Sequence, residues 1–530
     1  MSKRLIIILA LAFVVGISCA AYAEVQNVKV SGDITVMGVA RNNFDLATSG
    51  TATSTATSTP YDSQVFGKER DLLSITRIRV DADLTDNVST TVRLLNERNW
   101  NGESEHSGQY DYNVVSSSFD SGGTGMELDL AYVTMKEFLY SPLTMKVGRQ
   151  ELRFGSGLVV GDPDTNQYSW TTALAEGDLS ARKSFDAVRA TLDYNPLVVD
   201  AIFAKVVEGH VQMNDDVTLA GVNAGYDMGR NTMLEGYFFS KVKGSEAPAV
   251  YNIDATNATS FDRNVAGSNV TTKNVSDKVF TIGARAVNKS VKNLTVGVEG
   301  AYQFGTYNPK FDPNAAYLTP AGKILKAETS NRRAFALQAD VAYDLKDIAQ
   351  LTKYSPVISA NYTYLSGADR NKTGDGKYKG WDPMFEDQTI GHVMNAIFGN
   401  TNMSRGSFSA KGKLTDDIGL KLDYVLAYLA RKIPEGRLVS LSGLGVVTTS
   451  AANSSRTFRM GGKSYLGQEI DATLTYDYTE DVQFALLGGV FLPSSNINDG
   501  YAINTSGGIA TNERHNTPAS ELIGSMKVTF

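Results

Sequence analysis

Short segments of the chain place apolar and polar residues at alternate positions. Between residues 72 and 84, for example, Ile78 and Val80 alternate with Arg79 and Asp81. A period of two is the pattern of β-strands, because successive side chains of a strand point to opposite faces of the sheet. The C-terminal residues repeat it, with apolar residues at every second position up to Phe530. The pattern predicts an all-β protein.

About 18 segments carry this alternation, and an even number of strands is typical of single-chain bacterial outer-membrane barrels. We expect strands near residues 28–40, 72–84, 88–98, 126–137, 142–154, 185–194, 197–206, 216–227, 231–242, 278–287, 293–305, 333–344, 356–366, 404–414, 418–430, 464–477, 482–492 and 521–530. In such a barrel the apolar face of each strand contacts lipid and the polar face lines the lumen. A large soluble β-protein is the alternative.

The lengths of the connections favour the barrel. Short turns such as 85–87 alternate with long connections such as 99–125, 367–403 and 431–463, as expected for periplasmic turns and extracellular loops. Two connections fit less well: 207–215 is short for an outer loop, and 345–355 is long for a turn and could form a short helix. We therefore predict a transmembrane antiparallel up-and-down β-barrel of about 18 strands.

The N-terminus has the features of a secretory signal peptide. A basic start is followed by an apolar run and by Ala21-Tyr22-Ala23, so we expect residues 1–23 to be cleaved. Cys19 leaves open a lipoprotein, although the residues before it lack the usual leucine. No later stretch reaches the roughly 18 apolar residues of a transmembrane helix. Residues 24–530 are then one barrel domain in the bacterial outer membrane.

Composition excludes several kinds of function. The formal charge is −7, and losing Lys3 and Arg4 with the signal peptide makes it −9, which argues against a nucleic-acid partner. Cys19 is the only cysteine, so the mature chain has no disulfide and no thiolate metal site. The four histidines lack metal-binding spacing. Residues 369–375 resemble the start of a calcium loop but lack its final glutamate, so a polar loop explains them better. We expect no metal, no cofactor and no enzymatic activity, since no nucleophile or phosphate-loop motif is complete.

Several motifs, spread over most of the chain, are similar to the alginate-export family of outer-membrane barrels. They are the Val-Gly-Arg-Gln stretch at 147–150, Phe-Asp-Ala-Val-Arg at 185–189, Ser-Gly-Ala-Asp at 366–369 with Trp-Asp-Pro-Met-Phe at 381–385, and Gly-Gln-Glu-Ile-Asp at 467–471. The resemblance implies an 18-stranded barrel with an arginine-rich conduit that passes an anionic polysaccharide. Of the conduit residues, it carries over Arg149, Asp186 and Arg189.

Charged residues on the polar faces are the candidate lumen and selectivity residues. The set is Arg77, Arg79, Arg93, Asp129, Arg149, Arg153, Asp186, Arg189 and Arg285. Arginines on a lumen wall attract carboxylates, which they bind through a two-point fork. The alternative is that these charges pair across strands and only stiffen the barrel.

Arg149 and Arg153 border the connection 155–184, which either folds into the barrel and narrows it or remains a surface loop. If Val147 faces lipid, strict alternation points Arg149 outward as well, whereas a bulge near Gly148 would turn it inward. The sequence leaves both questions open.

We therefore expect an outer-membrane channel for a polar, anionic solute or polysaccharide. A non-selective general diffusion porin is the alternative, and a hydrolase or adhesin built on the loops is a third possibility. The expected partners are outer-membrane lipid, the solute, the barrel-assembly machinery acting on the strand that ends in Phe530, and periplasmic export or other envelope proteins.

Overall fold

A computed structural model describes most of the chain after the N-terminal region. The described residues are 27–44, 46, 68–100, 126–163, 177–208, 216–229, 231–244, 251–252, 269–270, 276–307, 330–368, 377–435, 438–440, 445–446, 457–500 and 517–530. The expected signal peptide 1–23, the calcium-like residues 369–375 and the histidines His106, His210 and His515 lie outside them.

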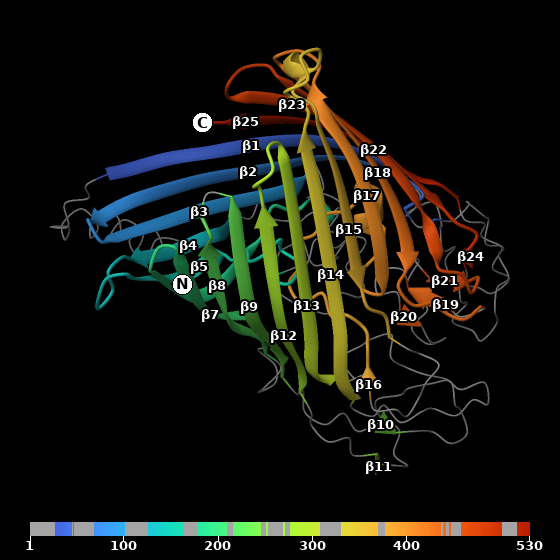
Figure 1. Ribbon diagram of the computed structural model, residues 1–530, viewed down its shortest axis with the longest axis horizontal. Helices are drawn as coiled ribbons and strands as arrows, with labels where there is room; N and C mark the ends of the chain where they lie inside the picture. Colours follow the sequence, from blue (N-terminus) through green and yellow to red (C-terminus); the bar gives the residue numbers. More distant parts are fainter. Residues whose placement is uncertain are drawn as a thin grey trace, which may run out of the picture.

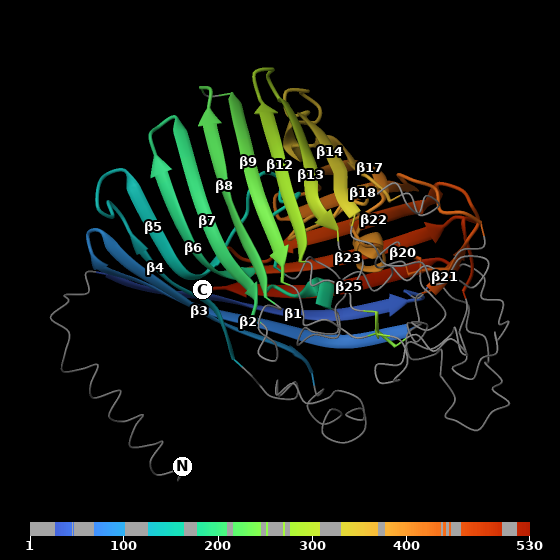
Figure 2. The same cartoon turned by 90° about the horizontal axis from the view of Figure 1, so that it is seen from below.

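One antiparallel sheet closes on itself to form the barrel. Its strands are β1 (Asn27–Asn42), β2 (Lys68–Thr85), β3 (Val88–Asn99), β4 (Glu127–Met135), β5 (Leu143–Glu151), β6 (Ser184–Asp193), β7 (Leu197–Val207), β8 (Val217–Asp227), β9 (Thr232–Lys243), β12 (Asp277–Asn288), β13 (Leu294–Tyr307), β14 (Ser330–Asp344), β15 (Val357–Leu365), β17 (Met403–Lys413), β18 (Ile418–Leu429), β22 (Tyr465–Asp477), β23 (Val482–Pro493) and β25 (Ala519–Thr529). Each pairs with its neighbours in chain order, and β1 also pairs with β25 (Figures 1 and 2). Among the described residues the sheet has 19 strands, and without the short β16 it is a closed ring of 18. The predicted barrel is confirmed, and each expected segment overlaps one of these strands.

Smaller elements lie outside the ring or in the connections. They are β10 (Tyr251–Asn252), β11 (Asn269–Val270), β16 (Lys377–Tyr378), β19 (Leu438–Ser440), β20 (Gly445–Val446), β21 (Thr457–Met460), β24 (Ile497–Gly500), the helix α2 (His392–Ile397) and the 3₁₀ turns η2 (Gly177–Leu179) and η4 (Thr352–Tyr354). The turn η4 lies within the 345–355 connection, where the sequence allows a short helix. No helix among these residues is long and apolar enough to cross a membrane.

The alternation of the strands divides their side chains between lipid and lumen. On β2, Ile78 is 38% exposed on the outer face, whereas Arg77 and Arg79 lie on the inner face with Leu73 and Ile75, which are buried. Large apolar side chains are exposed in the same way around the barrel: Ile34, Val133, Val147, Val188, Phe203, Val222, Ile282, Val298, Phe335, Phe408, Leu422, Ile470, Leu486 and Leu522. Lipid covers this surface, since a barrel satisfies its backbone hydrogen bonds within its own wall.

The two ends of the barrel differ in their connections. At one end, short turns such as 86–87, 194–196 and 478–481 join the strands, whereas the other end carries the long connections, including 152–183 and 366–402. Because bacterial barrels have short periplasmic turns and long extracellular loops, the second end is extracellular.

The lumen contains a hydrophobic core. Most of its residues come from the inner faces of the strands and from the two long connections 152–183 and 366–402, and Phe44, Leu46 and Ile433 of other connections join them. Those from the connections are Leu152, Phe154, Leu158, Val159, Val160, Trp381, Met384, Phe385, Ile390, Val393, Met394, Ala396, Ile397 and Phe398. The described parts of both connections therefore fold into the barrel and form a plug.

Candidate functional site

The plug consists of two segments, 152–162 and 379–402, that are joined through their backbones. Phe385 N–H donates to the carbonyl of Val159 at 3.0 Å, and Gly161 N–H donates to the carbonyl of Phe385 at 2.7 Å. Val160 also forms isolated bridges with Phe154 and with Phe385. The two segments thus form a small irregular sheet inside the barrel, and moving one requires moving the other.

Apolar burial accounts for the inward position of these segments. Val160 is fully buried, and Leu158, Val159, Trp381 and Phe385 are at most 3% exposed. Full burial of one large apolar side chain stabilises a fold by about 1.5–3 kcal/mol, so a loop this rich in apolar residues favours the interior over water. The structure therefore settles the open question about the 155–184 connection for its described residues 155–162, which lie inside the barrel.

Carboxylates of the wall hold the first plug segment. Gly155 N–H donates to Glu235 Oε1 at 2.9 Å, and Ser156 N–H donates to Glu299 Oε2 at 2.8 Å. Gly155 has a φ of +62°, and a Cβ there would lie 2.6 Å from Glu299 Oε1. A side chain at this position would therefore conflict with both the backbone and the wall. Ser156 Oγ adds a hydrogen bond of 2.5 Å to Gln338 Oε1.

Another wall carboxylate holds the helix of the second segment. Val393 N–H and Met394 N–H donate to the two oxygens of Glu469 at 2.9 and 2.6 Å, and His392 N–H donates to Asp471 at 3.4 Å. The first N–H groups of a helix have no partner within it, so an acceptor from β22 satisfies them. The preceding Gly391 has a φ of +74°.

Asp382 connects the second segment to the opposite wall. Its side chain accepts a hydrogen bond from Lys241 Nζ at 3.0 Å and lies 3.6 Å from Arg332 Nη2. Its backbone N–H and C=O both bond to the side-chain amide of Gln303, at 2.9 and 2.7 Å. Burial acts to raise the pKa of Asp382, but Lys241 and Arg332 outweigh it and lower the pKa to about 2. Asp382 is therefore ionised at any physiological pH.

Glu386 lies buried within the plug. Its oxygens accept hydrogen bonds from Asn400 Nδ2 and Gln388 N–H, both at 2.6 Å. Asn400 in turn accepts a hydrogen bond from the buried Arg405 of β17. Burial raises the pKa of Glu386 to about 7, against the lowering effect of these hydrogen bonds. This carboxyl group therefore titrates near neutral pH.

Asp387, the next residue, lies at the edge of the plug between two cations. Arg153 Nη1 and Lys183 Nζ each pair with one of its oxygens. The Arg153 side chain is 52% exposed and that of Asp387 16%. Arg153, predicted as a lumen residue, thus links the two plug segments and still faces solvent.

The predicted arginines of β2 and β3 lie on the inner wall, each beside a carboxylate. Arg77 pairs with Asp33 at 2.9 Å, Arg79 with Asp81 at 2.7 Å, and Arg93 with Asp129 and Glu151 at 2.5 Å. Arg79 also faces Arg93 directly across the β2–β3 register. Like charges in this position are destabilising unless they are compensated. The carboxylates supply that compensation.

The predicted Asp129 lies on the inner wall at a bulge. The β3–β4 register shifts between Arg93 and Leu94, which pair with Leu130 and Leu128, so Asp129 has no direct cross-strand partner. Asp129 is 1% exposed and also accepts a hydrogen bond from Ser184 Oγ at 3.0 Å.

Arg189 and Arg285 also lie on the inner face. Arg189 pairs with Asp200 of β7 at 2.7 Å, and its guanidinium lies 5.3 Å from the ring centre of Phe154 in the plug. Arg285 lies 3.7 Å from Glu299 and donates to the carbonyl of Gly155 at 3.4 Å. Both therefore contact the plug as well as the wall.

Arg149 and Asp186 do not line the lumen, which corrects their prediction as lumen residues. They face each other across the β5–β6 register, and their side chains lie 3.4 Å apart. Asp186 lies between Phe185 and Ala187, which are both buried in the lumen core, so it points outward. The β4–β5 and β5–β6 pairings have no register shift at Gly148, so Arg149 shares the outer face with Val147.

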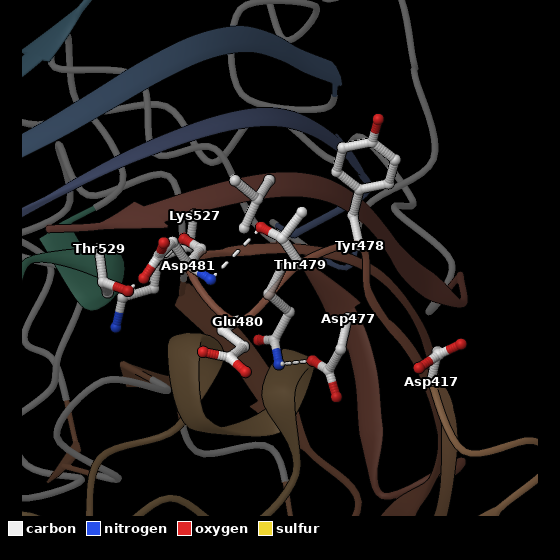
Figure 3. Close-up of a pocket in the computed structure, with 10 residues that line it drawn as sticks. Asp417, Asp477, Tyr478, Thr479, Glu480, Asp481, Lys527 and Thr529 are labelled. Atoms are coloured by element: carbon white, nitrogen blue, oxygen red, sulfur yellow. Dashed lines mark hydrogen bonds between the residues drawn. The ribbon is translucent and has the colours of Figure 1, made fainter.

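A separate cavity of about 670 Å³ opens at the periplasmic end (Figure 3). It is lined by Asp417, Asp477, Tyr478, Thr479, Glu480, Asp481, Val482, Gln483, Lys527 and Thr529. The carboxylates that line this cavity outnumber its one lysine, so the cavity does not attract anions by itself. In the described residues, no group of three or more His, Cys, Asp and Glu side chains is arranged to hold a metal ion.

Sequence reasoning did not predict the second plug segment as an inward fold. Its residues belong to the stretch 367–403, which we expected to be an extracellular loop. The available signal was composition: Trp381, Met384 and Phe385, followed by the apolar α2, are unusual in a loop that faces water. The ion pair of Arg153 with Asp387 joins residues far apart in the chain, and no local pattern indicates it.

Comparison with known proteins gives one family. The sequence model of the alginate export family matches residues 57–505, which is most of the chain. No curated protein matches the sequence.

Among solved structures, similar chains include OccAB2 of Acinetobacter baumannii, with 9% identity and a TM-score of 0.48 over 96% of this chain and 99% of that chain. OccK2 (OpdF) of Pseudomonas aeruginosa, solved in complex with glucuronate, has 9% identity and a TM-score of 0.45 over 96% of this chain and 99% of that chain. OmpT of Vibrio cholerae has 9% identity and a TM-score of 0.35 over 96% of this chain and all of that chain.

Proposed function

This chain belongs to the alginate export family and is an outer-membrane channel; from that premise we propose that its plugged lumen passes polar anionic solutes, acidic polysaccharides among them. The proposal assigns selectivity to the inner-wall cations and to those at the plug edge. The residues are Arg77, Arg79, Arg93, Arg153, Arg189 and Arg285, with Asp129 positioning Arg93.

The observation that carries the proposal is the unequal exposure of the two partners within the lumen ion pairs. Side-chain exposure is 52% for Arg153 against 16% for Asp387, and 27% for Arg189 against 5% for Asp200. Lys421 is 47% exposed, whereas its partner Asp423 is 10% exposed. In these pairs the carboxylates lie behind the cations, so a solute in the lumen meets positive charge first. Four cations do not follow this order: Arg93 and Arg182 are less exposed than Glu151 and Glu127, and Arg41 and Arg332 are less exposed than their carboxylate partners.

The plug increases the difference in exposure between the cations and the carboxylates of the lumen. It covers the wall carboxylates Glu235, Glu299 and Glu469, because their oxygens accept its backbone N–H groups. The plug therefore keeps cations in the lumen from direct contact with these carboxylate oxygens. The wall arginines remain partly accessible, and arginine binds carboxylate groups through its fork of N–H donors.

Single-channel recording in a KCl gradient tests the proposal. The wild-type channel should show a reversal potential of the anion-selective sign. The variant R79Q/R153Q/K421Q removes the exposed cation from each of three lumen ion pairs. Its preference for anions over cations should disappear or reverse. The control K136Q/K289Q/K292Q removes the same charge from exposed periplasmic turns and should behave like the wild type.

Two results would refute anion selectivity. A wild-type channel without ion preference would be a general diffusion porin. If the lumen variant has an unchanged reversal potential, these cations have no role in ion selection.

We also propose that residues 1–23 are a cleaved signal peptide, that residues 24–530 are one domain, and that barrel-assembly machinery recognises the strand ending in Phe530. Periplasmic export proteins are further proposed partners.

A further inference from the structure

Basic residues on the outer face of the barrel gather at one end. Within the described strands, the outward-facing lysines and arginines are Arg70, Arg98, Arg149, Lys205, Lys278 and Arg333. Each belongs to the same alternating set as the lipid-facing apolar residues of its strand; Lys205, for example, follows Phe203, and Arg333 precedes Phe335. Every one lies within four residues of the extracellular end of its strand. We call this set the extracellular cationic rim.

The opposite end of the outer face has a different character. Outward positions at the periplasmic strand ends carry no lysine or arginine in the described residues, and many are apolar or aromatic, as at Val28, Leu234, Phe484 and Val528. A charged side chain on the outer face costs little free energy near either surface of a bilayer, so the cost of burial alone would allow cations at both ends. The asymmetry therefore indicates a difference between the two leaflets, with a negatively charged surface at the extracellular one.

Two members of the rim lie on the strands that flank β13. Lys278 on β12 faces Thr306 of β13, and Arg333 on β14 faces Phe304 of the same strand. Phe304 also faces Phe280, and the two rings lie 5.5 Å apart on the same outer face as the two cations. Aromatic side chains of barrels concentrate where the hydrocarbon meets the headgroups. Lys278 and Arg333 are thus at headgroup depth.

Within the described part of the chain, no carboxylate pairs with Lys278 or Arg333. In contrast, Lys205 pairs with Asp216 and Glu208, and Arg149 pairs with Asp186. Both Lys278 and Arg333 are exposed. Two exposed cations at a lipid surface are suited to an external anion, and arginine and lysine are the usual ligands of phosphate.

We propose that Lys278 and Arg333 bind phosphate groups of lipid headgroups in the external leaflet. The acyl chains of the same lipids pack on Phe280, Phe304 and Phe335, which are directed into the membrane below the two cations. The site fixes a phosphorylated lipid on the β12–β14 side of the barrel. It is independent of what passes through the lumen.

Native mass spectrometry of the full-length barrel in a neutral detergent tests this site. The probes are bisphosphorylated lipid A and its dephosphorylated form. Wild type should prefer the bisphosphorylated lipid, and K278Q/R333Q should lower its affinity for that lipid roughly tenfold while leaving the dephosphorylated lipid unaffected. The control K136Q/K289Q removes two lysine charges from exposed periplasmic turns and should bind like wild type.

The exchanged variant K278R/R333K keeps both charges and should keep the affinity, which separates lost binding from misfolding. Heat-modified gel mobility checks that every variant is folded. The proposal is overturned if K278Q/R333Q binds bisphosphorylated lipid A as tightly as wild type. It is also overturned if the control loses as much affinity, or if wild type binds the dephosphorylated lipid equally well.

Discussion

The carboxylate of Glu469, on the inner face of β22, accepts the backbone N–H of Met394 at 2.6 Å. A residue of the barrel wall thereby fixes the start of a helix that lies inside the lumen. Together with the bonds of Glu235 and Glu299 to Gly155 and Ser156, this contact holds the plug by its backbone. Substitutions of these few wall carboxylates should therefore change how firmly the plug is held in the lumen.

Replacing Glu469 with glutamine should loosen α2. The amide retains one acceptor oxygen and turns a donor toward the second N–H, so a charge-assisted hydrogen bond is lost, at a cost of about 1.5–3 kcal/mol. Hydrogen exchange of the amides of 393–398 should accelerate roughly tenfold or more. Glu480→Gln, on an exposed periplasmic turn, is the matched control. Unchanged protection in E469Q would mean that apolar packing alone holds the helix.

The plug should be more firmly seated at acidic pH. Burial raises the pKa of Glu386 from 4.5 to about 7, so the folded plug binds a proton that the displaced loop releases. The stabilisation is complete below about pH 4.5 and is lost as pH rises through about 7, with a total of at most about 3 kcal/mol. The closed dwell time of single channels should therefore fall between pH 5 and pH 8.

Glu386→Gln should remove this pH dependence, because the amide does not titrate. His392 begins the neighbouring helix α2, so His392→Gln is the control and should keep the dependence. If E386Q retains the pH response and H392Q abolishes it, Glu386 is not the responsible group.

Gly155→Ala should displace the first plug segment. The new Cβ would lie 2.6 Å from Glu299 Oε1 at a φ of +62°, and strain of this kind costs about 1–3 kcal/mol. Leu158→Cys provides a reporter, because Leu158 is 1% exposed and the expected mature chain has no cysteine. Thiol labelling should be faster in G155A/L158C than in L158C. In contrast, G524A/L158C should match L158C, because a Cβ at Gly524 has nothing within 4 Å.

Phe530→Ala should impair assembly more than stability. The backbone of Phe530 exchanges two hydrogen bonds with Gly32, of 2.8 and 3.0 Å, which the substitution keeps. Its ring is 60% exposed, so the folded barrel loses little when it is removed. The heat-modifiable fraction in cells should drop severalfold, while the unfolding midpoint of refolded protein changes little. Phe484→Ala, another exposed aromatic at the same end, should assemble normally; an equal defect there would point to lost lipid contacts instead.

The barrel itself could be predicted from the sequence. A strand between lipid and water must alternate apolar and polar side chains, so the position of Ile78 outside and Arg79 inside follows from their neighbours alone. Every expected segment overlaps a barrel strand for this reason. The alternating lengths of the connections likewise assigned the two ends.

Tertiary structure alone decided what fills the lumen and which charges face it. The bond between Phe385 and Val159 joins loops that are distant in sequence, and no periodic pattern encodes it. A bulge placed Leu130 on the inner face next to the predicted Asp129, while an unshifted register left Arg149 outside. Local alternation reports only which solvent a strand side chain meets; the partner of that side chain depends on how the closed wall and its inward loops come together in space.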